Sequence, residues 1–366
     1  MIEQNDFIKK LFMNVNKNCW ICMATGVIVG ILTHLYMLTN KLPNWDDLTT
    51  FGYHGMGIEN GRWMLPKLHK MAGVWSVPAL NGVLAILLLS VATCFILEIL
   101  ELKTVTSAVI VPFIMMTFPS VACSMTFMYL ADIFAIGLLF GCVGTWLIRK
   151  YKYGWLPGVV LLIMCIATYQ SYICFVAGLL VFALVLDLFR KKEVKDVIKK
   201  GCVSLGSLVL SMGIYVILTK YVIGGLMDYK GIDKMGEIDL VRLPRLIARS
   251  YKRILEFFVM KPWGYLSETG KNMNLLVVVM IVAGFFFLIW KLQILREKDR
   301  SILVCILIIL FPLSLASSYI IAPEANPTLL LLHQYVLMYF VPLGFWELFM
   351  AAEAGDDKKA VYGNTT

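Results

Sequence analysis

The chain has 366 residues, of which 60% are hydrophobic and 16% charged, and its mean hydropathy is +0.79. A soluble core of this length cannot hide so much apolar surface, whereas the hydrocarbon of a bilayer accepts it directly. These values exclude an ordinary soluble domain and predict an all-α polytopic membrane protein, with residues 1–366 forming a single integral domain. The formal net charge of +9 then concerns how Lys and Arg divide across the bilayer, and we expect no nucleic-acid partner.

Ten apolar segments are long enough to cross a bilayer about 30 Å thick. They lie at about 20–38, 79–100, 105–121, 127–148, 155–169, 170–189, 201–222, 273–291, 301–321 and 328–348. No small-residue cleavage site follows the first segment, so we interpret it as a retained anchor rather than a signal peptide. The run 155–189 is too long for one helix, and its polar break at 167–171 predicts two helices joined by a tight outer turn.

Basic residues divide unevenly between the connections. If the N-terminus is inside, the inner connections hold 19 of the 33 Lys and Arg residues; they are 1–18, 101–104, 149–154, 190–200, 291–300 and the tail from 349. The short outer turns near 120–127, 169–170 and 322–327 hold none. The positive-inside rule therefore predicts that both termini are cytoplasmic and that two long loops, 39–78 and 223–272, lie outside.

The first outer loop carries a dense group of reactive side chains. Asp46 and Asp47 follow Trp45 near the outer end of the first span, and Arg62 and Trp63 come later in the same loop. Adjacent carboxylates and an arginine cost free energy to hold close to lipid, which favours a functional site. The alternative is a solvated loop with acidic residues and an interfacial tryptophan, and this stretch alone leaves both interpretations open.

The second outer loop contains an amphipathic helix. Apolar residues recur at helical spacing from Leu243 to Phe258, with basic residues between them. The arginines of the basic face are Arg245, Arg249 and Arg253. We expect this helix to lie in the membrane interface, either as a cover for the bundle or as a site whose cations hold a lipid-borne phosphate. A similar interfacial segment is predicted to begin at Trp63, with Pro66 in its first turn.

Few other polar residues fall at membrane depth. Asp132 stands near the outer start of the fourth span with no basic residue within one turn, so we expect it to face an aqueous cavity. The alternative role for Asp132 is a helix cap. Tyr169, Gln170 and His333 also fall on the outer side. Together with Trp45 and Trp63, they are our candidates for lining a substrate cavity.

Redox, metal and nucleotide chemistry find little support in the sequence. Cys19 and Cys22 match C-x-x-C, but they open a membrane helix and lack the βαβ context of a redox motif. The other cysteines are scattered through apolar segments without metal-ligand spacing. There is no P-loop, no G-x-G-x-x-G, no H-E-x-x-H and no G-x-S-x-G. An activated substrate used on the outer face is therefore expected to arrive on a lipid.

A family resemblance emerges from the order and membrane placement of four motifs. Asp46-Asp47, Gly61-Arg62-Trp63, Asp132 and the Tyr169-Gln170 turn resemble the pattern of bacterial and phage serotype-converting O-antigen glucosyltransferases. The resemblance covers about residues 20–200 well and the remainder by topology. Such proteins are similar to the wider GT-C class, which takes a sugar from a polyprenyl phosphate and places it on an acceptor outside the membrane.

The resemblance implies a GT-C-like hexosyltransferase in the bacterial cytoplasmic (inner) membrane. It would move a sugar, glucose first among the candidates, from a polyprenyl-phosphate carrier to a surface glycan such as O-antigen or a wall polymer. A flippase and a donor-synthesising enzyme would be its protein partners. The resemblance gives catalytic roles to Asp46 and Asp47 and a supporting one to Asp132.

A chemical mechanism follows from these roles. One first-loop carboxylate would take the proton of the acceptor hydroxyl, because an alcohol is a poor nucleophile until a base is in reach. The phosphate leaves as an anion, and its developing charge would be stabilised by a cation. The candidates are Arg62, Arg245, Arg249 and Arg253. A divalent metal is compatible with this scheme, but no ligand set in the sequence demands one, so metal use is left open.

Two other functions compete with glycosyl transfer. A transporter or flippase for a lipid-linked or small solute should show internal repeats and polar residues at the bilayer midplane. Repeats are not evident here, and midplane polar residues are scarce. A membrane scaffold without chemistry is the third interpretation. It rests on length: family members usually have further C-terminal helices or an outer domain, and we expect this chain to lack that part.

Overall fold

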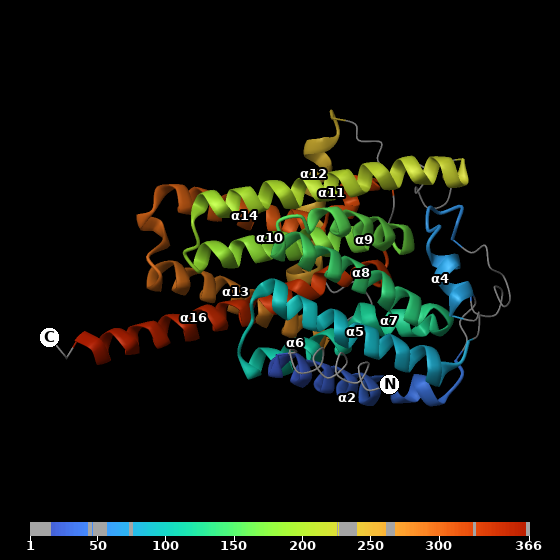
Figure 1. Ribbon diagram of the computed structural model, residues 1–366, viewed down its shortest axis with the longest axis horizontal. Helices are drawn as coiled ribbons and strands as arrows, with labels where there is room; N and C mark the ends of the chain where they lie inside the picture. The colour runs from blue at the N-terminus through green and yellow to red at the C-terminus, as the bar shows by residue number, and fades with distance from the viewer. Residues whose placement is uncertain are drawn as a thin grey trace, which may run out of the picture.

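The protein is described by a computed structural model covering residues 16–42, 46, 57–72, 76–224, 226, 240–260, 268–324 and 327–363, the side chains of residues 268 and 355–363 excepted. Within these ranges the regular structure is helical and contains no strand. The all-α class predicted from composition is therefore confirmed (Figure 1).

The helices follow one another along the chain with short connections. In the first half they are α2 (Lys17–Thr39), α4 (Leu65–Met71), α5 (Pro78–Leu100), α6 (Val105–Thr117), α7 (Pro119–Thr126), η1 (Met128–Leu130), α8 (Ala131–Lys150), α9 (Trp155–Thr168) and α10 (Tyr172–Phe189). In the second half they are α11 (Val194–Ile223), α12 (Leu243–Leu255), η2 (Glu256–Met260), α13 (Glu268–Lys291), η3 (Ile294–Arg296), α14 (Lys298–Leu315), α15 (Ser318–Ile321), η4 (Leu329–Leu331), η5 (His333–Tyr335) and α16 (Val336–Gly363).

The number of membrane spans is smaller than the ten predicted. Among the described residues, seven helices are long and apolar enough to cross a membrane, or eight if α6 and α7 form one span bent by 48°. The bend follows from Pro119, which disfavours helical geometry at Phe118, where ψ is 135°. The two predicted spans that fall short are α9, whose 14 residues reach about 21 Å at the helical rise, and α14, which begins with three charged residues.

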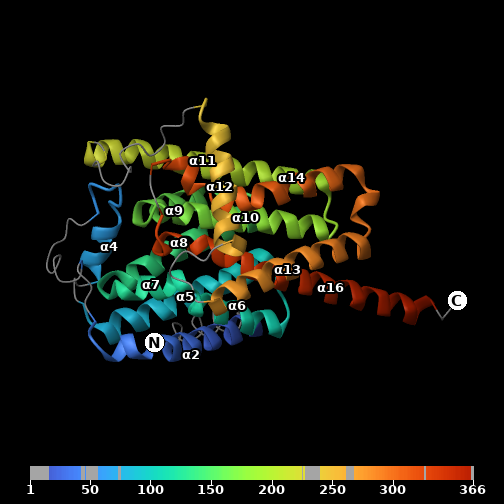
Figure 2. The same cartoon turned by 180° about the vertical axis from the view of Figure 1, so that it is seen from behind.

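The long helices run side by side along the longest axis of the molecule (Figure 1). The connections 101–104, 190–193 and 292–297 lie at the same end as the C-terminus, and we call this the basic end. Helix α4 lies at the opposite end, here called the α4 end (Figures 1 and 2). The connections predicted to be inner and the loop predicted to be outer thus lie at opposite ends of the bundle.

Close contact between α2 and α5 depends on small residues. A Cβ atom at Gly26 would lie 2.5 Å from Ser90 Oγ, and one at Gly30 would lie 2.6 Å from Ile86 Cγ2. The two glycines are four residues apart, so they share one face of α2 and let the two backbones approach. This packing places the end of α2, from which the first outer loop departs, beside the start of α5 at the α4 end.

Candidate active site

A tight turn at 57–62 presents Arg62 at the α4 end. The Arg62 N–H donates to the Gly57 carbonyl at 2.9 Å. Gly57 and Gly61 both have φ of +80°, a region that favours glycine. Space also requires glycine at position 61, because a Cβ there would lie 2.5 Å from the Tyr215 hydroxyl. The local sequence therefore holds the arginine in one place.

The side chain of Arg62 meets the turn between α9 and α10. Its Nε donates to Gln170 Oε1 at 3.1 Å. Its Cζ lies 4.6 Å from the centroid of the Tyr169 ring, within cation–π distance. The Gln170 amide nitrogen in turn donates to the Asn60 carbonyl. Three of the candidate residues, from two segments about a hundred residues apart, thus form one cluster, which we call the Arg62 site.

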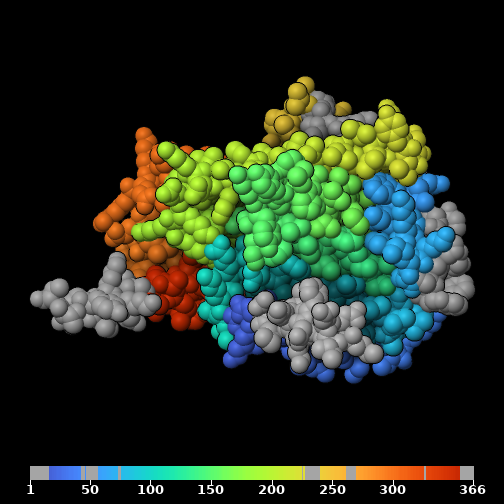
Figure 3. Space-filling model, viewed as in Figure 1, coloured from blue at the N-terminus to red at the C-terminus, as the bar shows by residue number. Residues whose placement is uncertain are grey.

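Helix α11 holds the same loop from the other side. The Tyr215 hydroxyl donates to the Gly61 carbonyl at 3.0 Å and accepts from Gln170 Nε2 at 3.2 Å. The Trp63 indole N–H donates to Thr219 Oγ1 at 3.2 Å, and Trp63 is buried. Figure 3 shows α4 (blue) next to the yellow tip of α11. Trp63 therefore anchors the loop to the bundle.

The electrostatics of the Arg62 site suit an anion. Within the described residues, no carboxylate lies within 4.0 Å of the half-buried Arg62 guanidinium. Burial raises the pKa of Tyr169, an effect that the charge of Arg62 opposes, so the ring stays a neutral phenol near pH 7. Since Nε is held by Gln170, the planar guanidinium is oriented in advance. Such a group matches the oxygens of a phosphate.

His333 reaches this site through stacked rings rather than directly. Tyr172 lies 5.2 Å from the Tyr169 ring and 5.3 Å from the His333 ring, measured between centroids. His333 is buried, and its Nε2 lies 3.0 Å from Ser124 Oγ. The imidazole is therefore one aromatic layer behind Arg62.

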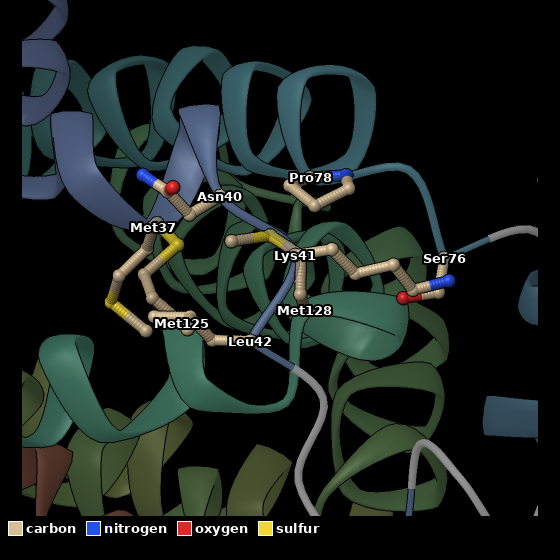
Figure 4. Close-up of a pocket in the computed structure, with 8 residues that line it drawn as sticks. All are labelled: Met37, Asn40, Lys41, Leu42, Ser76, Pro78, Met125 and Met128. Atoms are coloured by element: carbon tan, nitrogen blue, oxygen red, sulfur yellow. The ribbon is translucent and has the colours of Figure 1, made fainter.

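Asp132 occupies the first turn of α8, where the structure buries it. Its side chain accepts the Ile133 N–H at 3.0 Å and the Asn81 amide N–H at 3.4 Å. The residue is 3% exposed, and no cation of the described chain lies within 4.0 Å of its carboxylate. The expected aqueous cavity around Asp132 is not seen. A nearby hollow of about 10 Å³ is room for about one water molecule. It is lined by Met37, Asn40, Lys41, Leu42, Ser76, Pro78, Met125 and Met128 (Figure 4).

The first-loop acids are only partly described. Asp46 is exposed. Asp47 and Trp45 lie outside the described residues. Their catalytic and cavity-lining roles therefore stay predictions.

Helix α12 brings together two of its three candidate arginines. Arg249 and Arg253 have Cζ 5.7 Å and 5.9 Å from the centroid of the buried Tyr319 ring. Arg249 also donates to the Pro323 carbonyl at 2.6 Å, and Arg253 pairs with Glu256 at 2.9 Å. Arg245 is exposed, away from this ring. The helix lies across the bundle axis in both cartoons (Figure 2), as predicted for an interfacial helix.

Comparison with known families decides the class of the protein. Residues 35–344 match the family model described as Glucosyl transferase GtrII. The chain belongs to the GtrII glucosyltransferase family. The resemblance drawn from the sequence motifs is thereby confirmed, and the match extends well beyond residues 20–200. No curated protein and no solved structure matches the chain.

Two residues of this GtrII-family site were not singled out from the sequence. Tyr215 lies in a long apolar helix, where hydropathy does not distinguish it from a lipid-facing tyrosine. Gln334 is fully buried, and neither atom of its amide has a hydrogen-bond partner among the described residues. A signal for Gln334 was present, since it follows His333 and the two form a polar pair at the start of an apolar span.

Metal ligands are not grouped in the described part of this GtrII-family chain. No three side chains of the His, Cys, Asp or Glu type lie close enough there to hold an ion. Asp47 falls outside those residues, so no ligand set is assigned.

Proposed function

We propose that this GtrII-family protein transfers glucose from a polyprenyl-phosphate carrier to a surface glycan, such as O-antigen or a wall polymer, on the outer face of the bacterial cytoplasmic membrane. The family match supports glucosyl transfer. The observation that carries the lipid-phosphate donor is the Arg62 site. There a pre-oriented guanidinium lies at the end of an apolar bundle without a described carboxylate partner. A lipid-linked phosphate combines the chemistry of both surroundings.

The reaction is a displacement at the anomeric carbon. The acceptor oxygen attacks that carbon while the bond to the phosphate oxygen breaks, and the acceptor proton goes to Asp46 or Asp47. Polyprenyl phosphate leaves with the bonding pair, and Arg62 stabilises its charge. Arg249 and Arg253 are a second cationic group for the carrier phosphate. Asp132 supports the site from the start of α8, through Asn81.

The substrate cavity is proposed to follow the aromatic layer behind Arg62. Tyr169, Gln170 and His333 belong to it, with Trp63 fixing its rim and Trp45 in the loop above. The unpartnered amide of Gln334 suits a sugar hydroxyl, since a buried amide left without partners costs about 1–3 kcal/mol.

The donor chemistry also determines which partners are needed. Nucleotide-activated sugars are available inside the cell, whereas the Arg62 site is proposed to lie outside. A donor-synthesising enzyme must therefore load the carrier on the inner face, and a flippase must bring it across.

Mass analysis of surface glycans tests the proposed reaction. Cells carrying the gene are expected to show glycan repeats that are one hexose heavier than those of cells without it. Cells expressing an Arg62→Ala variant serve as the matched control, with the protein level checked by immunoblot. An identical glycan mass with and without the gene, in a strain that makes the donor, would favour the transporter interpretation.

Topology gives a second test. We propose that both termini are cytoplasmic, because the basic connections gather at one end of the bundle. Cysteine introduced at exposed Lys70 in α4 should react with a membrane-impermeant thiol reagent in intact cells. Cysteine at exposed Lys152, between α8 and α9, should be protected. The unsubstituted protein controls for exposed Cys202 and Cys305. Labelling at Lys152 with protection at Lys70 would invert the orientation.

A further inference from the structure

A second cavity, of about 190 Å³, lies at the basic end and is separate from the Arg62 site. It is enclosed by the last turns of α5 and α8 and the early part of α11. Its lining consists of Glu98, Ile99, Glu101, Trp146, Arg149, Lys150 and Lys200. Nothing in the proposed transfer reaction uses these residues.

The carboxylates near this cavity are already neutralised by cations. Asp187, which is fully buried, pairs with Arg149 at 2.8 Å and Lys192 at 2.7 Å. Glu101 pairs with Lys192 at 2.5 Å and Arg190 at 3.7 Å. Burial acts to raise the pKa of Glu101, but the hydrogen bond and charge of Lys192, with Arg190, hold it below its usual value. These acids therefore stay ionised and paired.

A surplus of positive charge and donors remains in the cavity. The cluster holds five cations against the three carboxylates of Glu98, Glu101 and Asp187, a formal charge of +2. The half-buried Lys200 has no carboxylate within 4.0 Å among the described residues. The Arg149 side chain is 7% exposed, and one of its terminal nitrogens has no hydrogen-bond partner in the described chain. Buried donors of this kind are satisfied by a ligand with acceptor oxygens.

Aromatic residues place the cavity at the membrane interface. The Lys150 ammonium lies 4.6 Å from the centroid of the Trp146 ring, which lines the cavity. The next connection carries three large aromatic side chains, Tyr151, Tyr153 and Trp155, with exposed fractions of 51%, 67% and 36%. Exposed Trp and Tyr at the end of membrane helices mark the level of the lipid headgroups. A ligand at this level is a lipid headgroup before it is a free solute.

We propose that this cavity binds the phosphate headgroup of an anionic phospholipid from the leaflet at the basic end. Arg149 and Lys200 contact the phosphate oxygens, and Lys150 stays against Trp146 at the mouth. Basic pockets between membrane helices on the cytoplasmic side suit such headgroups, because anionic lipids enrich that leaflet. The site would tie α5, α8 and α11 together at the end opposite the proposed catalysis.

Native mass spectrometry of the purified full-length protein tests this proposal, with phosphatidylglycerol or phosphatidylcholine added to the detergent. Wild type should retain phosphatidylglycerol in preference. Lys150→Gln and Lys200→Gln should each weaken its binding about fivefold, and the double variant about thirtyfold, from the usual contribution of one basic residue near anionic lipid. Lys199→Gln, at the exposed neighbouring position, is the matched control and should bind as wild type. Unfolding midpoints confirm that the variants are folded.

Three results would overturn the assignment. Equal retention of the two lipids would remove the requirement for an anionic headgroup. An equal loss in Lys199→Gln would show general surface attraction rather than a site. Inorganic phosphate that binds as tightly as the lipid, with the same dependence on Lys150 and Lys200, would identify a water-soluble phosphate as the ligand. None of these readouts depends on glycosyl transfer.

Discussion

Asparagine in place of the general base is expected to lower the rate of hexose transfer about 10²- to 10⁴-fold, the usual contribution of a positioned base. The two candidates are Asp46 and Asp47, and we expect the larger loss at Asp47, the residue further from the interfacial Trp45. Asparagine keeps the size of the side chain but cannot accept the proton of the acceptor hydroxyl. The neighbouring carboxylate then orients the acceptor without replacing the base.

The measurement is the initial rate of hexose incorporation in membranes supplied with lipid-linked donor and acceptor glycan. Asp299→Asn, at an exposed position at the basic end, is the matched control and should retain the full rate. Normal rates in both loop variants at normal expression would contradict the mechanism and leave the transporter interpretation as the better one.

Alanine at Arg62 is expected to reduce transfer about 10²- to 10³-fold, the cost of removing one pre-organised donor from a site of developing negative charge. Arg62→Lys should recover only part of this loss. Lysine keeps the charge, but it has neither the planar fork that matches phosphate oxygens nor the guanidinium plane that stacks on Tyr169. It also cannot reproduce the Nε contact with Gln170.

Arg296→Ala, at an exposed position at the basic end, is the control for loss of one arginine. Varying the donor concentration separates binding from chemistry, since loss of leaving-group stabilisation lowers kcat as well as kcat/KM. Full activity of Arg62→Ala would move the phosphate site to Arg249 and Arg253. The same alanine substitutions there would then be expected to show the loss.

The helical membrane class was determined by the sequence alone, because hydropathy over a window of about twenty residues reports directly on transfer into lipid. The division of the run 155–189 was equally local. A polar break in apolar sequence cannot stay inside one helix of that length, and the structure ends α9 at Thr168 and begins α10 at Tyr172. The amphipathic pattern of α12 likewise predicted a helix, since a 3.6-residue period needs no tertiary information.

The tertiary structure decided which polar residues share a site. Arg62 and Gln170 meet across 108 residues of chain, and Tyr215 joins them from a helix that hydropathy marks only as apolar. Of the α12 arginines, two share the Tyr319 ring and Arg245 does not, although all three lie on the same predicted face. Periodicity gives the direction of a side chain about its own helix. Its partners depend on how helices distant in sequence pack together, which only the assembled bundle specifies.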